Sequence, residues 1–146
     1  MRGFRDRQEM TETYAGTASR SGQRLVNSVC AQEPGFVLFS FDVSQAFAKG
    51  MTFEEYARLT GLPLRHVEFN LAREDVPFLK QIPGFENFNP ETECLSMLKA
   101  IYGLKDAPRA WRMKLDEILR AWNGLQPMIA EPELYLCHEP DHTRKK

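Results

Sequence analysis

Apolar residues recur at helical spacing in two stretches of the chain. The first stretch begins after Ser19 or Ser21, either of which can cap a helix. It extends to about Gln32, and the dipeptide Pro34-Gly35 then stops the pattern. The apolar positions of this helix are Leu25, Val26, Val29 and Cys30. Because they share one face, we expect them to pack into a core.

The second stretch starts at Pro108, a residue suited to the first turn of a helix, and ends before Gly124. Its apolar positions are Trp111, Leu115, Ile118, Leu119 and Trp122. This spacing predicts a helix with one buried face. We expect both tryptophans to anchor a core rather than to stack on nucleic-acid bases.

A shorter helix is predicted from its capping residues. Thr52 and Glu55 have the spacing of a capping box, in which each side chain bonds to the backbone N–H of the other residue. The helix should therefore run from Phe53 to about Thr60, and Gly61 should close it.

Three apolar runs have the length of β-strands. Residues 36–43 are unbroken and rich in aromatic side chains, which predicts a strand buried on both faces. Residues 76–81 and 133–137 predict shorter strands, and the Ile-Pro-Gly-Phe sequence at 82–85 predicts a turn after the first of these two. Together with the helices, these runs predict an α+β fold.

An acid, Asp42, lies near the end of the longest of these runs. After it, Ser44 can cap a single helical turn through Phe47 that Gly50 terminates. A carboxylate fixed at the end of a strand is a common way to hold a metal ion, because Mg²⁺ prefers hard oxygen ligands. It is equally a common way to end a strand, and the local sequence does not decide between the two.

The composition narrows the class of protein. With 146 residues, 42% of them hydrophobic, the chain is long enough for one domain with its own core. Its 19 basic and 20 acidic residues leave a net charge of -1, which excludes a strongly basic nucleic-acid binder. Three widely spaced cysteines favour a reducing compartment. No apolar stretch has the length of a membrane span, so we expect a soluble intracellular protein without membrane partners.

The chain contains three distinctive strings: FSFDVSQAFAKG from Phe39, FLKQIPGF from Phe78 and LKAIYGLKDAPRAW from Leu98. In this order they resemble three blocks of the copia-type retrotransposon reverse transcriptase. RGF near the start and AEPELYL from Ala130 resemble two further blocks of the same family. The matching blocks span nearly the whole chain.

The resemblance assigns roles to individual residues. Asp42 falls on the aspartate of the first polymerase motif, which in this family ligates the Mg²⁺ ions that carry the incoming nucleotide. The main chain after it lies against the triphosphate, and Phe47 falls where an aromatic ring beneath the sugar excludes a 2′-hydroxyl. The implied nucleotide-binding residues are Val43, Ser44, Gln45, Ala46 and Phe47. Without the resemblance, Phe47 equally fits a core aromatic on a short helix.

A second family motif contacts the template strand and the nucleotide, and it falls on the loop before the tryptophan-bearing helix. The implied contacts are Gly103, which allows close backbone approach, Lys105, which can approach a phosphate, and Pro108, which begins the helix. The family usually has glutamine where this chain has Asp106. An acid there suits a helix N-terminus but repels phosphate.

The resemblance also implies what the chain lacks. The family completes its metal site with adjacent aspartates in a hairpin after the last strand, and this sequence has no Asp-Asp pair. We therefore expect a truncated, incomplete fingers and palm, in which an antiparallel sheet is packed by helices. Residues 1–136 would form a partial reverse transcriptase domain and residues 137–146 a polar tail.

The implied partners are an RNA or DNA primer-template, deoxynucleoside triphosphates and the remainder of a polyprotein. With one catalytic acid, Asp42, we expect this chain alone not to polymerise DNA. The alternative function is a non-enzymatic remnant, or a module that binds nucleic acid or protein.

Overall fold

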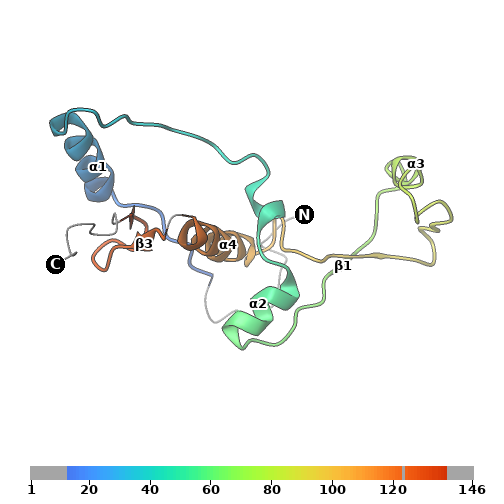
Figure 1. The fold of residues 1–146 in the computed structure, drawn as a ribbon. Helices are drawn as coiled ribbons and strands as arrows, with labels where there is room; N and C mark the ends of the chain where they lie inside the picture. The colour runs from blue at the N-terminus through green and yellow to red at the C-terminus, as the bar shows by residue number, and fades with distance from the viewer. Residues whose placement is uncertain (1–12, 123, 138–146) are drawn as a thin grey trace, which may run out of the picture. The chain divides into compact units, whose positions relative to one another are not determined.

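The computed structural model describes residues 13–122 and 124–137. Within this part, the helical elements are α1 (Arg20–Gln32), the 3-10 helix η2 (Ala46–Lys49), α2 (Phe53–Thr60), α3 (Val76–Leu79) and α4 (Ala107–Ala121), and the strands are β1 (Glu68–Phe69), β2 (Leu95–Ser96), β3 (Gln126–Pro127) and β4 (Tyr135–Leu136) (Figure 1). The chain divides into two compact units. The first contains the chain up to Gly50 and from Ile101 onward, and the second is Met51–Ala100.

In the first unit, α1 forms where the sequence predicts it. Its cap is Ser19, whose hydroxyl oxygen accepts a hydrogen bond of 3.0 Å from the backbone N–H of Gly22. The expected burial of its apolar face is wrong, because Leu25 is 49% exposed and Val26 and Val29 are each 42% exposed. These side chains line an open groove, so periodicity marks the face correctly but does not supply a partner for it.

Residues 36–43 do not form the predicted buried strand. They are extended but have no ladder partner among the described residues, and Figure 1 shows them as a plain trace between α1 and η2. Phe39 is 82% exposed and Phe41 is 79% exposed. A strand exists only where a neighbouring strand satisfies its backbone groups, and a local apolar run cannot guarantee one.

The short helix after Asp42 begins later than predicted. Ser44 does not cap it; the residue before Ala46 is Gln45, which adopts a left-handed conformation (φ 53°) and makes no side-chain capping bond. Gly50 ends the element as expected, since its N–H donates to the carbonyl of Phe47 at 3.0 Å.

The helix α4 confirms the prediction that starts it at Pro108, which lies in its first turn. Its buried residues are the small side chains Ala107 and Ala110. The prediction of one fully buried apolar face is wrong, because Trp122 is 60% exposed and Ile118 is 47% exposed. Trp111 is half-buried.

A two-stranded antiparallel hairpin follows α4. Gln126 pairs with Leu136 and Pro127 with Tyr135, so β4 lies within the strand predicted over residues 133–137. Its partner β3, which contains a proline, was not predicted.

The second unit is built around α2. The capping box is present: the Glu55 N–H donates to Thr52 Oγ1 at 3.1 Å, and the Thr52 N–H donates to Glu55 Oε2 at 2.8 Å. Gly61 ends the helix in a left-handed conformation, as expected. The buried apolar residues of this unit are Met51, Phe53, Tyr56, Val76, Phe88 and Ala100.

The rest of this unit holds a second small antiparallel sheet, with Glu68 opposite Ser96 and Phe69 opposite Leu95. The strand predicted over residues 76–81 is wrong, because Val76–Leu79 is the short helix α3. Pro77 explains the difference: it has no N–H to donate to a ladder, but it fits the first turn of a helix. The turn at 82–85 is confirmed by a 3.1 Å bond from the Phe85 N–H to the Ile82 carbonyl.

The described residues therefore combine helices with small antiparallel sheets, in agreement with an α+β fold.

Candidate functional site

The predicted metal ligand, Asp42, is exposed. It follows the extended, unpaired run of residues 36–41 and does not end a strand. Within the described part of the chain, its carboxylate makes no hydrogen bond or ion pair with another residue. Asp42 is therefore accessible, but its position is not fixed by a sheet.

One of the residues after Asp42, Phe47, contacts the loop that precedes α4. Val43, Ala46 and Phe47 are half-buried, whereas Ser44 and Gln45 are exposed. The ring of Phe47 lies 4.7 Å from the ring of Tyr102, centroid to centroid, with 50° between the planes. This tilted contact joins the first predicted motif to the second, which lies more than fifty residues later in the sequence.

Backbone contact strengthens this junction. A Cβ atom added at Gly50 would lie 3.1 Å from the Phe47 carbonyl oxygen, 3.2 Å from the Trp111 nitrogen and 3.3 Å from the Ala110 carbonyl carbon. Gly50 is buried, and the end of η2 lies so close to the backbone of α4 that a residue with a Cβ atom would be crowded there. From the sequence, Gly50 was predicted only to end the helical turn, and its contact with α4 was not predicted.

The loop residues of the second motif differ in exposure. Gly103 has φ 96°, a conformation that favours glycine, and Lys105 is exposed, as a phosphate contact requires. Asp106 is 2% exposed and immediately precedes α4. Its carboxylate lies at the positive end of the helix dipole, which favours an anion there. It is turned away from solvent, so its charge does not face an incoming phosphate directly.

Other acidic side chains of this unit are engaged in structural contacts. Glu131 accepts hydrogen bonds from the Ser19 N–H at 3.2 Å and the Ser19 hydroxyl at 2.6 Å. Glu133 pairs with Arg112 at 2.8 Å. The hydrogen bond that the Arg112 guanidinium donates to Glu133 raises the pKa of Arg112, so this side chain keeps its positive charge.

A further cluster ties α4 to the hairpin. The Tyr135 hydroxyl donates to Asp116 at 2.5 Å, and Arg120 pairs with the same carboxylate at 2.8 Å. Burial raises the pKa of Asp116, but the hydrogen bonds from Arg120 and Tyr135 outweigh it and leave that pKa below its usual value. Burial and the bond to Asp116 raise the pKa of Tyr135 to about 12.

A magnesium site can be tested against these positions. Among residues 13–122 and 124–137, no group of three His, Cys, Asp or Glu side chains could hold a metal ion. Asp42 offers one carboxylate, whereas two-metal phosphoryl transfer needs several around an ion pair. The described residues therefore do not fit a two-ion site, although Asp42 can supply one oxygen ligand.

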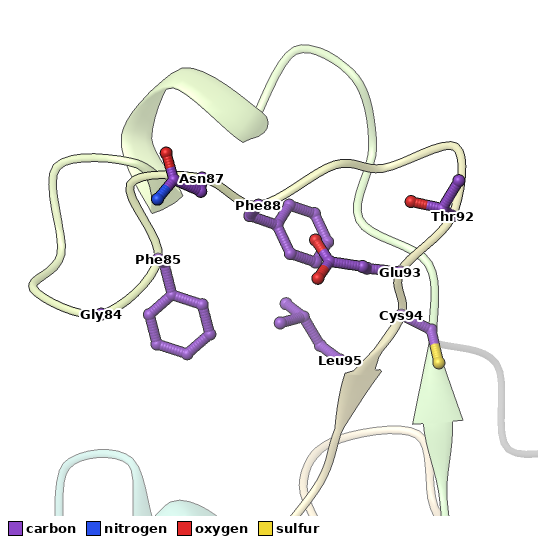
Figure 2. A pocket seen from close by; sticks show the side chains of 8 residues that line it. All are labelled: Gly84, Phe85, Asn87, Phe88, Thr92, Glu93, Cys94 and Leu95. Carbon is purple, nitrogen blue, oxygen red and sulfur yellow. The ribbon is translucent and has the colours of Figure 1, made fainter.

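The second unit contains a cavity of about 520 Å³ that the sequence did not indicate (Figure 2). It is lined by Gly84, Phe85, Asn87, Phe88, Thr92, Glu93, Cys94 and Leu95. In Figure 2 the Glu93 carboxylate is drawn beside the Phe88 ring and above Leu95, and the Phe85 ring lies farther to the left.

The polar groups of this cavity have local roles. Glu93 accepts a bond of 2.6 Å from the Asn89 N–H, and Cys94 donates to Glu68 at 3.5 Å. The bond to Glu68 raises the pKa of the Cys94 thiol, so the thiol stays protonated and is a poor nucleophile. Cys94 is therefore not an activated nucleophile in this cavity.

The chain is similar to known proteins over much of its length. Residues 66–140, about half of the chain, match the family described as reverse transcriptase (RNA-dependent DNA polymerase). The chain belongs to this family. The match includes the loop before α4 and the β3–β4 hairpin, and it begins after Asp42.

Two curated relatives are similar over most of the chain. The retrovirus-related Pol polyprotein from transposon RE2 of Arabidopsis thaliana is 31% identical over 112 residues, which cover 68% of this chain and 7% of the polyprotein. The corresponding polyprotein from transposon RE1 of the same plant is 29% identical over 116 residues, covering 71% of this chain and 8% of the relative.

The chain thus spans less than a tenth of either polyprotein. No solved structure matches it significantly. None of the described helices is both long and apolar enough to cross a membrane.

Proposed function

We propose that this chain carries the first catalytic-acid motif and the template-side loop of a retrotransposon RNA-directed DNA polymerase. Asp42 would be one Mg²⁺ ligand, and residues 43–47 would face the nucleotide triphosphate and sugar. Gly103, Lys105 and Pro108 would lie near the template and the nucleotide. The observation that carries the proposal is the direct packing of η2 on the start of α4.

This packing has a physical consequence for nucleotide binding. Phe47 is held by Tyr102 at 4.7 Å, and Gly50 is held against Ala110 and Trp111. Two backbone segments that a polymerase must bring to one nucleotide are therefore adjacent before any ligand binds. Such preorganisation lowers the entropic cost of assembling a binding site.

Catalysis needs more than this junction. Asp42 is a single exposed carboxylate, and Asp116, Glu131 and Glu133 are already bonded to neighbouring side chains. A second ion about 3.5–4 Å from the first has no ligand set among the described residues. We therefore expect that the 146-residue chain on its own does not polymerise DNA.

Binding of Mn²⁺, a paramagnetic substitute for Mg²⁺, tests the role of Asp42 directly. Trace Mn²⁺ should broaden the backbone amide resonances of residues 43–47, and Asp42→Asn should remove this broadening. Asp75→Asn changes an exposed acid in the other unit and should leave it intact. Broadening that survives in Asp42→Asn would exclude Asp42 as the ligand.

Primer extension on an RNA template tests the second part of the proposal. The parent chain and its Asp42→Ala variant should both fail to extend a primer with Mg²⁺ and all four deoxynucleotides. Extension by the parent that disappears in Asp42→Ala would show that the chain contains a complete catalytic site.

A further inference from the structure

The cavity of the second unit combines aromatic rings with a carboxylate (Figure 2). Its volume of about 520 Å³ falls within the range of roughly 300–1,000 Å³ that is usual for small-molecule sites. The whole lining comes from one continuous segment, residues 84–95. Asp42 and the loop before α4 lie in the other unit, so a role for this cavity does not depend on the proposed polymerase motifs.

The apolar part of the lining is held in place by backbone hydrogen bonds. The Phe88 N–H donates to the Phe85 carbonyl at 3.1 Å, and Leu95 pairs with Phe69 in the small sheet. Phe88 is 7% exposed and belongs to the core, whereas Phe85 is 38% exposed. The Phe85 ring is therefore accessible to a ligand, on a surface that is already formed.

The charge of the cavity is negative. Among the lining residues, Glu93 alone has a carboxylate, and none has a cationic side chain. Residues 84–95 contain two further acids, Glu86 and Glu91, and no lysine, arginine or histidine. A ligand that carries a phosphate or a carboxylate is therefore repelled, and a cation is attracted.

Glu93 has an oxygen that can accept a bond from such a cation. Its Oε2 atom accepts from the Asn89 N–H at 2.6 Å, which fixes the side chain. Within the described part of the chain, its Oε1 atom makes no hydrogen bond. The carboxylate is thus oriented by one oxygen and open to a ligand at the other.

We propose that this cavity binds a small organic ammonium ion with an aromatic body. One ammonium N–H bonds to Glu93 Oε1, and the Asn87 amide oxygen and the Thr92 hydroxyl are neutral acceptors in the same lining. The aromatic body packs against the Phe85 ring and Leu95, since aromatic pairs gain more than their buried area alone. The faces of phenylalanine rings also attract cations.

Titrations of the full chain with three small probes test the head group. Phenethylamine, 2-phenylethanol and phenylacetate share one ring and differ in charge. Phenethylamine should shift the Leu95 methyl resonances in NMR spectra, with a dissociation constant on the order of 1 mM. The alcohol should bind about fivefold more weakly, because Glu93 is exposed and its attraction is screened by solvent, and phenylacetate should bind more weakly still.

A fourth probe distinguishes a free aromatic amine from a lysine side chain of a protein. N-acetyl-lysine methylamide carries the same ammonium on an alkyl stem. It should bind more weakly than phenethylamine, because it makes no ring–ring contact with Phe85. Tighter binding of the lysine derivative would overturn the assignment to an aromatic amine.

Two matched variants test the carboxylate. Glu93→Gln keeps an oxygen that can accept from the Asn89 N–H but removes the charge, so phenethylamine should bind no better than the alcohol. Glu86→Gln makes the same charge change in the same segment. Because Glu86 bonds to the Gly84 N–H and does not line the cavity, this variant should keep the preference for the amine.

The apolar groove of the first unit provides an internal control. Leu134 lines this groove, whose lining residues carry no charge. Any shift of the Leu134 methyl resonances should therefore be the same for the amine and the alcohol. A preference for the amine there would show that the selectivity does not arise from Glu93.

Phe85→Leu tests the aromatic contact without changing any charge. Phe85 is partly exposed, so the variant should fold like the parent and bind the amine and the alcohol equally more weakly. Four results would overturn the proposal. They are no shift at Leu95 with phenethylamine, equal binding of amine and alcohol by the parent, a preference for the amine that survives in Glu93→Gln, and unchanged affinities in Phe85→Leu.

Discussion

The helices α1 and α2 begin alike and are buried differently. Each starts at a hydroxyl cap, Ser19 in α1 and Thr52 in α2. The apolar residues Val26 and Val29 of α1 are each 42% exposed, whereas Phe53 of α2 is 5% exposed. The caps determine where a helix starts, but burial depends on what the rest of the chain brings to it.

The first turn of α2 contacts a segment that lies far away in the sequence, residues 98–99. The Phe53 N–H donates to the Leu98 carbonyl at 2.9 Å, and Thr52 forms a β-bridge with Lys99. These bonds use backbone groups that the start of a helix leaves unsatisfied, and they fix residues 97–100 beside it. The corresponding contact of α1 is the bond between Ser19 and Glu131, and its apolar face remains open to the groove.

The largest predicted effect tests this difference in burial. Phe53→Ala should lower the free energy of unfolding by about 3 kcal/mol, because it removes a buried ring and leaves a cavity. Val29→Ala in α1 should change it little, since the lost contact is partial and alanine has the higher helix propensity. Urea denaturation of both variants measures the two values. Equal losses would show that the face of α1 is covered in solution.

The next effect concerns the closest packing in the first unit. Gly50→Ala should destabilise the chain by about 2 kcal/mol, because a Cβ there is too close to three backbone atoms of η2 and α4. The Phe47 and Tyr102 ring resonances should shift in the same variant, as the two elements separate. A variant with parental stability and unchanged ring shifts would show that η2 does not rest on α4.

The two caps should have similar effects despite the different burial of their helices. Thr52→Ala and Ser19→Ala should each reduce the free energy of unfolding by about 1 kcal/mol, because a cap satisfies a backbone N–H locally. Urea denaturation again gives both values. A neutral Ser19→Ala variant would show that α1 needs neither its cap nor the bond to Glu131.

The smallest effect is a titration. Tyr135 should ionise near its pKa of about 12, above the value of about 10 that an unperturbed tyrosine has in the unfolded chain. Between these values the unfolded chain has already lost the proton that the folded chain keeps, so stability falls as pH rises through this window. Ultraviolet absorbance of tyrosinate should show a late step that Tyr135→Phe lacks. A parent without the late step would mean that the bond to Asp116 is not formed.

Local signals explain which elements were predictable from the sequence. Ser19, the Thr52 and Glu55 pair, Gly61 and Pro108 each act within one turn of their own helix, and all of them behave as expected. The strand prediction for residues 36–43 failed because a strand depends on a partner from elsewhere in the chain. β1, β2 and β3 are two residues long, too short to leave a periodic pattern.

The same distinction holds for the candidate site. The family strings indicated both motifs, and the structure brings Phe47 to Tyr102 across a long sequence separation. Nothing local in the sequence indicated that Gly50 contacts Ala110 and Trp111, because that need arises only once α4 is in place. Nor did helical spacing indicate that Trp122 would be exposed.

The left-handed backbone at Gln45 limits how this chain can diverge. A residue with φ 53° that is not glycine is tolerated with least cost when it is asparagine or aspartate, and β-branched residues are strongly disfavoured. Substitution at this position is therefore restricted to a few amino acids. A glycine, asparagine or aspartate at position 45 in a descendant sequence would record that the turn between Asp42 and η2 is still inherited.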